Sequence, residues 1–170
     1  MGRATSNIAK AQAEYCDQII QVECLVGEIG ADYVELWLED ESQEHVTGYI
    51  RASIPSEELV DLEQSQLISV VGRVDPKIEK VTTHVNGLTF DQLEYSMSDA
   101  HVSKTTVEWT GVIHSKNSSF KHGYDFEVGN SIFLRVVYFD KDQTPEISNE
   151  EITVSGVVIA GQMHHGVIVK

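Results

Sequence analysis

The chain has 170 residues, of which 41% are hydrophobic and 23% are charged, and its formal net charge is −15. This composition is typical of a soluble globular protein and excludes a disordered chain. No apolar run approaches the roughly 20 residues of a membrane span. The start, Met1 to Ser6, lacks the apolar core of a signal peptide. We therefore expect a cytoplasmic protein without membrane contact, with the periplasm or a lipoprotein as the alternative if an export signal precedes Met1.

The acidic residues are concentrated in the first part of the chain. Residues 1–99 carry 19 acidic and 6 basic residues, a net charge of −13, whereas residues 100–170 carry 8 and 6, a net charge of −2. Phosphate backbones are bound by basic surfaces, so the first part is a poor candidate for a nucleic-acid site and the second stays open. The two cysteines, Cys16 and Cys24, are too few for a disulfide framework, and we expect reduced thiols.

The first predicted element is a short helix. It is expected over residues 7–15, where alanines recur behind Ser6 as a possible N-cap. Apolar and polar residues then alternate as in half-buried strands. The first part continues with strands at 19–29, 31–38 and 46–53, a short helix at 55–62, and strands at 67–74 and 87–93. After a polar linker at 96–103, strands are expected at 107–114, 124–128, 132–139, 152–159 and 166–169.

Two pairs of glycines repeat at a matched spacing. Gly27 and Gly111 each interrupt the first strand of their half, and Gly72 and Gly156 each interrupt the fourth, with an offset of 84 residues in both cases. A glycine inside a strand indicates a bulge or tight bend, and a repeat of this size indicates two copies of one domain. We predict a first domain over residues 1–99 and a second over 104–170.

Five strands with bending glycines, and a helix between the third and fourth strands of the first copy, are typical of an OB-fold. The first copy resembles the tRNA-anticodon-binding-like OB-fold family in Val26-Gly27, in Ser56-Glu57-Glu58-Leu59 and in Val70-Val71-Gly72-Arg73-Val74. The resemblance implies a barrel with a ligand-binding face and brings no catalytic residue. The predicted fold class is all-β, with two tandem five-stranded Greek-key barrels and short helices. The alternative is an SH3-like barrel or a two-sheet sandwich.

OB-folds bind ligands mainly on the outer face of strands two and three. In the first copy this face displays aromatic residues around one cation and is acidic, with Tyr33, Trp37, Tyr49, Arg51, Glu35 and Glu39. Aromatic residues and arginine are enriched in protein interfaces, while the glutamates oppose phosphate. We interpret the face as a protein-binding patch; the alternative is a sheet face that is solvated or covered by the N-terminal helix.

The second copy has two loops that are rich in histidine and lysine. The loop after its first strand contains no acidic residue, and the expected loop between strands four and five is Gly161 to Gly166. Together they supply the candidate ligand residues His114, Lys116, Phe120, Lys121, His122, His164 and His165. They suggest binding of single-stranded nucleic acid or a small anion, with polar surface loops as the alternative. The histidine spacings match no metal-ligand motif, so we expect no metal and no cofactor.

The third strand of the second copy is apolar on both faces. A small barrel buries one face of a strand, so Phe133, Val137 and Phe139 are expected to contact the first copy, a second subunit or a partner. No catalytic motif is found. The sequence thus predicts a non-enzymatic binding or adaptor module that acts mainly through protein contacts. Single-stranded nucleic-acid or anion binding through the second barrel, and self-association, are the alternatives.

Overall fold

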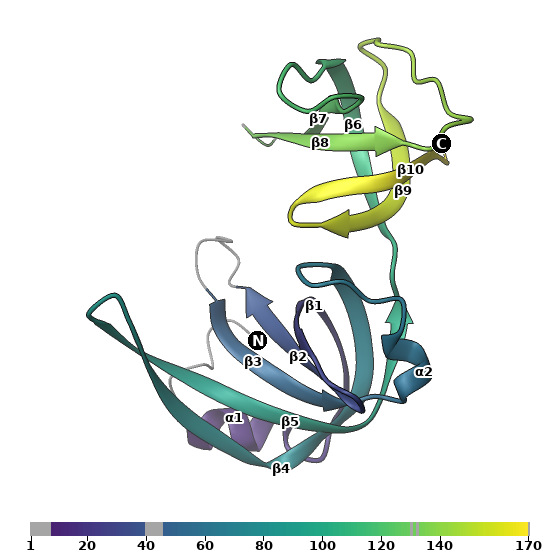
Figure 1. The fold of residues 1–170 in the computed structure, drawn as a ribbon. Coiled ribbons are helices and arrows are strands. Elements are labelled where there is room, and N and C mark those ends of the chain that lie inside the picture. The colour runs from purple at the N-terminus through teal and green to yellow at the C-terminus, as the bar shows by residue number, and fades with distance from the viewer. Residues whose placement is uncertain (1–7, 40–45, 130, 132, 170) are drawn as a thin grey trace. The chain divides into compact units, whose positions relative to one another are not determined.

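The computed structural model describes residues 8–39, 46–129, 131 and 133–169. The chain divides into two compact units, Met1–Lys104 and Thr105–Lys170, and each contains one closed five-stranded barrel (Figure 1). We call these barrel 1 and barrel 2. The prediction of two tandem all-β barrels with short helices is confirmed.

Barrel 1 is built from β1 to β5 in the order β1-β2-β3-β5-β4, with β4 pairing back onto β1. All neighbours are antiparallel except β3 and β5, which are parallel. The predicted N-cap, Ser6, lies outside the described residues. The elements of this unit are α1 (Ile8–Tyr15), β1 (Ile19–Ile29), β2 (Tyr33–Glu39), β3 (Val46–Ser53), α2 (Ser56–Leu59), β4 (Leu67–Val85) and β5 (Leu88–Lys104).

Barrel 2 repeats this topology with strands of its own. Its order is β6-β7-β8-β10-β9, and β8 and β10 form the parallel pair. The shared order is that of an OB-fold, and closure leaves no free sheet edge in either barrel. The strands are β6 (Val107–Lys116), β7 (Tyr124–Val128), β8 (Leu134–Phe139), β9 (Ile152–Ile159) and β10 (Gln162–Ile168).

The alternation in the sequence places one row of each strand in the core. In β2, Val34, Leu36 and Leu38 are buried, whereas Tyr33 and Trp37 lie on the other face. Successive strand residues point to opposite faces, so the same pattern that fills the barrel also fixes which side chains face outward. The core of barrel 2 consists of Trp109, Ile113, Phe126, Val137, Val154, Val158 and Met163.

The glycines of the first strand allow the second strand to approach closely. A Cβ at Gly27 would lie 2.5 Å from the Trp37 indole nitrogen, and a Cβ at Gly111 would lie 1.8 Å from the Glu127 carbonyl oxygen. The strand pairing is irregular close to both glycines. In β1 the irregularity includes Gly27, as predicted, whereas in β6 it follows Gly111 and lies between Ile113 and Ser115.

The glycines of the fourth strand make room for a methionine of the fifth. A Cβ at Gly72 would lie 2.6 Å from Met97 Cγ, and a Cβ at Gly156 would lie 2.7 Å from Met163 Cγ. Both methionines are almost completely buried. The repeat in the sequence is thus also a repeat in the packing.

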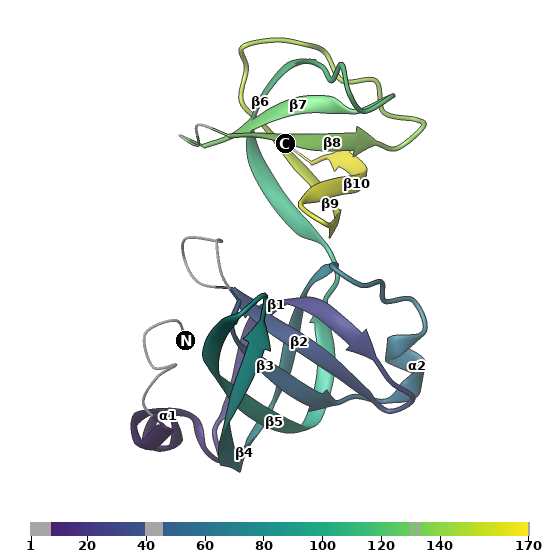
Figure 2. The same ribbon diagram turned by 60° about the vertical axis from the view of Figure 1, so that its left-hand side comes forward.

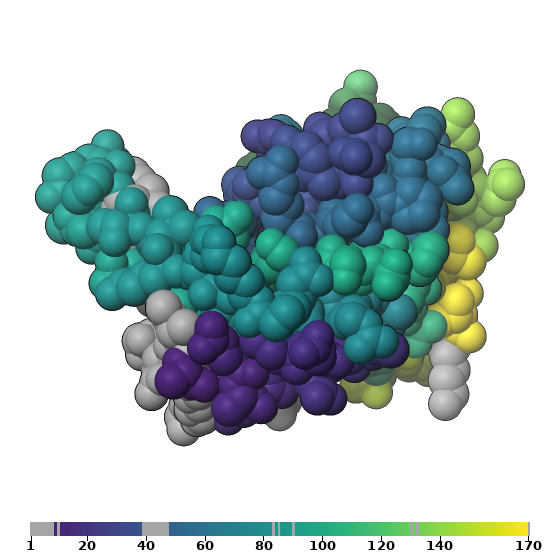
Figure 3. Space-filling view, turned by 90° about the horizontal axis from the view of Figure 1, so that it is seen from below, coloured from purple at the N-terminus to yellow at the C-terminus, as the bar shows by residue number. Residues whose placement is uncertain are grey.

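Strands four and five of barrel 1 are longer than the sequence analysis predicted. β4 and β5 continue as a two-stranded arm that stands clear of the barrel (Figure 3). Asn86 and Gly87 close the arm with φ values of 51° and 79°, as in the two-residue turns that match strand twist. The pair Asn-Gly is a strong hairpin signal, and it was the signal that the sequence analysis did not use.

The predicted linker at 96–103 is wrong. These residues belong to β5, because Met97 and Ala100 face the core and Val102 pairs with Val70 of β4. Polar residues between them occupy the outer face, which made the segment look like a linker. The division between the two units falls after Lys104.

The short helix α2 is attached to the end of β5 by one carboxylate. Glu58 Oε2 accepts a hydrogen bond of 2.7 Å from the Val102 backbone N–H, and its Oε1 lies 2.7 Å from His101 Nδ1. The hydrogen bond with His101, and then that with Val102, lower the pKa of Glu58. Next to it, Leu59 is buried in the core.

The equivalent glycines Gly27 and Gly111 should tolerate alanine differently. Gly111→Ala meets a backbone oxygen that cannot move without breaking the β6–β7 pairing, so we expect a loss of roughly 2 to 3 kcal/mol in the stability of barrel 2. Gly27→Ala meets the partly exposed indole of Trp37, which can turn away, and should cost roughly 1 kcal/mol in barrel 1. Urea unfolding in Trp37→Phe and Trp109→Phe backgrounds follows each barrel separately. Equal losses would contradict this account.

The Glu58 contacts should make barrel 1 sensitive to acid. A carboxyl group whose pKa is lowered by folding stabilises the fold above its ordinary pKa of 4.5, and this contribution is lost as the pH falls below that value. We expect the urea midpoint to fall less between about pH 7 and about pH 3 in Glu58→Gln than in the unchanged protein. Glu57→Gln, an exposed neighbour on the same helix, is the control and should leave the acid dependence unchanged.

Candidate functional site

The four candidate residues of barrel 1 lie together on the outer face of β2 and β3. The strand register places Trp37 opposite Tyr49, and Glu35 opposite Arg51. Tyr33 follows on the same row of β2, next to Arg51. The structure thus brings together the residues that the sequence analysis selected, and we call them the aromatic face. The side chain of Glu39 lies outside the described residues.

The rings of the aromatic face are held by contacts with charged neighbours. The Arg51 guanidinium lies 3.9 Å from the centre of the Tyr33 ring, and the Tyr33 hydroxyl donates a hydrogen bond to Glu28. Trp37 Nε1 donates a bond of 2.7 Å to Glu35 Oε1. Because these contacts restrict the side chains, binding on this face would cost barrel 1 little additional side-chain entropy.

Carboxylates surround the aromatic face. The Tyr49 hydroxyl donates a hydrogen bond of 3.1 Å to Glu94 Oε2, and burial, followed by this bond, raises the pKa of Tyr49 to about 12. A hollow of about 250 Å³ adjoins Glu94 and is lined by Asp75, Lys77, Glu79, Glu94 and Ser96. The surroundings are thus more acidic than basic, which favours cationic groups.

The N-terminal helix does not cover this face. α1 packs against β4 (Figure 2), with Ala11 buried and the Tyr15 ring 6.4 Å from the Tyr95 ring in an edge-to-face contact. The reading in which this helix covers the candidate patch is therefore wrong. Trp37 retains 37% of its surface exposed.

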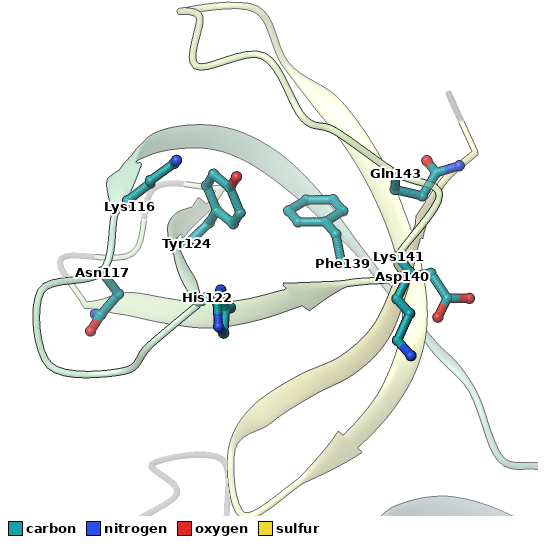
Figure 4. Close-up of a pocket in the computed structure, with 9 residues that line it drawn as sticks. Lys116, Asn117, His122, Tyr124, Phe139, Asp140, Lys141 and Gln143 are labelled. Carbon is teal, nitrogen blue, oxygen red and sulfur yellow. The ribbon is translucent and has the colours of Figure 1, made fainter.

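In barrel 2 the structure places a pocket of about 590 Å³ at one end of the barrel (Figure 4). The rings of Tyr124 and Phe139 form its apolar part and meet edge to face, 5.5 Å apart. The remaining lining residues come from the loop after β6 and the segment after β8: Lys116, Asn117, His122, Gly123, Asp140, Lys141 and Gln143.

The corresponding end of barrel 1 is filled by α2. Leu59 of this helix and Leu62 after it are buried in the core, and Ile54 N–H, just before the helix, donates to Asp32 of the β1–β2 turn. Barrel 2 has no helix between Phe139 and Ile152 and has a longer loop between its first two strands. Both differences were expected from the sequence, and together they leave this end of barrel 2 open.

The loop after β6 is held in one shape by Asn117. Its side-chain oxygen accepts hydrogen bonds from the backbone N–H groups of Ser119 and Phe120, at 2.8 and 2.7 Å, and its amide donates to Asp125. Asn117 N–H also donates to the Gly123 carbonyl, which closes the loop. Lys116 and His122 are therefore presented from a fixed loop.

The other candidate residues of barrel 2 do not form one site with this pocket. Phe120 and Lys121 lie in the same loop but do not line the pocket, and His114 is paired with Glu127. His164 and His165 were expected in a loop. They lie in β10 instead, because Ala160 and Gly161 close a tight turn with φ values of 49° and 75°.

The two histidines of β10 have separate partners. His164 stacks on Tyr138 with the ring centres 5.0 Å apart, and His165 Nδ1 lies 3.4 Å from Asp140 Oδ1. Within the described residues, no group of three or more histidine, cysteine, aspartate or glutamate side chains is arranged to hold a metal ion. Neither α1 nor α2, the helices that the structure describes, is long and apolar enough to cross a membrane.

The sequence analysis missed Tyr124, Lys141 and Gln143 as pocket residues. Tyr124 and Phe126 share one row of β7, and Val137 and Phe139 share one row of β8, so the alternation already placed these rings on the inner side. The polar stretch after β8 was treated only as a turn.

The expected interface row is wrong for Val137 and Phe139, and it stays a prediction for Phe133. Val137 is completely buried, and Phe139 packs on Tyr124, so both lie on the inner side; Phe133 is 73% exposed. The outer row contains Val136 and Tyr138, which lie against Gly123 of the β6–β7 loop and against His164. Barrel 2 itself therefore partly covers Val136 and Tyr138, whereas Leu134 of the same row is 52% exposed. Ile132, which the alternation of the sequence places in the same row, lies outside the described residues.

The chain matches no family model, no curated protein and no solved structure. The resemblance to the tRNA-anticodon-binding-like family therefore stays a prediction. The fold follows from the strand order alone.

The two ends of β8 should respond differently to substitution. Val137→Ala removes two methyl groups from a completely buried site and should cost about 2 kcal/mol, whereas Phe133→Ser at an exposed site should change the stability of barrel 2 by less than about 0.5 kcal/mol. Urea unfolding followed by Trp109 emission measures both. A large loss for Phe133→Ser would show that Phe133 is covered in solution.

Proposed function

We propose that the chain is a non-enzymatic binding module whose barrel 1 takes basic side chains of a protein partner on the aromatic face. The observation that carries the proposal is the arrangement of the Tyr33, Trp37 and Tyr49 rings, each hydrogen-bonded to a carboxylate, that of Glu28, Glu35 and Glu94 respectively. Aromatic faces attract arginine and lysine through cation–π contacts, and the carboxylates strengthen the attraction.

The charge of the face argues against a nucleic-acid ligand. A nucleic-acid strand that stacked on Trp37 would bring its phosphates close to Glu35 on the same β-strand and to Glu94 on β5, which pairs with β3. Binding of nucleic acid instead draws on cations that release counterions from the phosphates. Arg51 is the one cation among the four candidate residues, and its guanidinium already lies over Tyr33.

The thiol chemistry supports a module without catalysis. Burial raises the pKa of Cys24 to about 12, and burial also raises the pKa of Cys16. The thiolate is the nucleophilic form, so both groups are protonated and unreactive at neutral pH. Both cysteines are free.

A basic probe peptide tests the proposal directly. We expect a fluorescein-labelled peptide of alternating arginine and glycine to bind the full chain, with an anisotropy change that weakens as salt screens the charges. Trp37→Ala should lower the affinity by roughly tenfold or more, as for a central interface residue. Glu35→Gln should also weaken binding.

Glu63→Gln provides the matched control because it removes the same charge from the loop after α2. It should leave the affinity unchanged. Equal binding of a glutamate–glycine peptide, or an equal effect of Glu35→Gln and Glu63→Gln, would contradict the proposal. Light scattering on the chain alone should give the mass of a monomer, and a dimer whose interface shields Trp37 would favour self-association instead.

A further inference from the structure

We propose that the pocket at the open end of barrel 2 binds a nucleotide, that is, an aromatic base that carries a phosphate. The proposal concerns barrel 2 alone and does not depend on peptide binding by barrel 1. The cavity of about 590 Å³ lies within the size range of small-molecule sites. It is lined by two aromatic rings, by lysine side chains and by the amide of Gln143.

The ring pair provides a surface for a planar group. Tyr124 and Phe139 meet at an interplanar angle of 83°, so one ring offers its face where the other offers its edge. Planar aromatic groups bind well against such pairs, and stacking on a protein ring is a general way to hold a base. Both rings are half-buried and stand at the ends of strands that pair with each other.

Two lysines beside the rings have no acidic partner. Within the described residues, neither Lys116 nor Lys141 forms an ion pair, whereas Lys77 and Lys80 of the barrel 1 arm pair with Glu79 and Asp91. Figure 4 shows Lys116 directed toward the Tyr124 ring, whereas the ammonium group of Lys141, on the Phe139 side, points away from the rings. The Lys116 ammonium group next to an aromatic surface suits a phosphate that follows a base.

The nearby carboxylates are turned to other partners. Asp140 is the one acid that lines the pocket; its Oδ1 lies 3.4 Å from His165 Nδ1, and Figure 4 shows its carboxylate pointing away from the rings. Asp125, behind the loop, accepts hydrogen bonds from Ser115 and Asn117. The positive charge of the lysines is therefore not cancelled at the rings.

Gln143 supplies a polar group for the edge of a base. Its side-chain oxygen accepts a hydrogen bond of 3.3 Å from Ile168 N–H. This leaves the amide NH₂ as a donor, which suits a ring nitrogen or a carbonyl oxygen of a base. The rings thus suit the face of a base, the cations suit its phosphate, and the Gln143 donor suits the polar edge of the base.

Calorimetric titration of the full chain tests the proposal with four probes: adenosine monophosphate, adenosine, inorganic phosphate and a short oligothymidylate. We expect adenosine monophosphate to bind with a Kd below about 1 mM at about 50 mM salt. Adenosine and phosphate should each bind more weakly, because each lacks half of the contacts.

Two variants and one control assign the binding to the pocket. Lys116→Ala should weaken adenosine monophosphate binding by roughly fivefold or more. Lys121→Ala removes the same charge from the same loop, but its side chain does not line the pocket, so binding should not change. Phe139→Leu keeps an apolar group and loses the ring, so it should weaken adenosine monophosphate and leave phosphate unaffected.

The outcomes separate the two sources of a nucleotide. If the oligothymidylate binds with this variant pattern and the free nucleotide does not, the site takes a nucleotide within a strand; the reverse result assigns a free nucleotide. No binding of either probe overturns the proposal, as does an equal effect of Lys121→Ala and Lys116→Ala. Glu35→Gln, which tests the aromatic face, should change none of these titrations.

Discussion

In each barrel, neighbouring strands pack closely against two glycines. At Gly111 a single added carbon would overlap the carbonyl of the neighbouring strand, and at Gly72 and Gly156 it would overlap a buried methionine. Without this close approach the first strand could not bend to pair with both the second and the fourth strand. The outer faces and barrel ends then hold their side chains in fixed places because the sheet beneath them is closed and has no free edge.

The same closed topology leads to different surfaces in the two barrels. In barrel 1, α2 fills one end with Leu59 and a short β1–β2 turn lies beside it, so exposed aromatic residues remain mainly on the outer face of β2 and β3. In barrel 2 the helix is missing and the loop after β6 is longer, so Tyr124 and Phe139 stand at an open end. The barrels differ in the connection between strands one and two and in that between strands three and four. As a result, the accessible aromatic surface lies on the side of barrel 1 and at the end of barrel 2.

The aromatic face of barrel 1 and the pocket of barrel 2 differ in the charged groups around them. Around Trp37 the hydrogen-bond acceptors are carboxylates, and the nearest guanidinium is stacked on a tyrosine. At the barrel 2 pocket the lysines form no ion pair with any residue that the structure describes, while Asp125 and Asp140 contact other groups. We infer that one chain combines a surface for cationic side chains with a pocket for an anion, and that neither competes with the other for ligands.

The sequence by itself determined the repeat, the fold class and the members of the aromatic face, because glycine spacing and strict alternation depend only on local sterics and strand geometry. It also indicated that barrel 2 lacks a helix after its third strand. Only the tertiary structure decided that residues 96–103 continue β5, that Val137 and Phe139 face inward, and that His164 and His165 lie in a strand. Each of these depends on which partner covers a residue, and an apolar strand with two similar faces does not specify its inner face. The pocket likewise depends on the tertiary structure. Lys116 and Lys141 are separated in sequence, and they line one pocket with Tyr124 and Phe139 only when the strands of barrel 2 close.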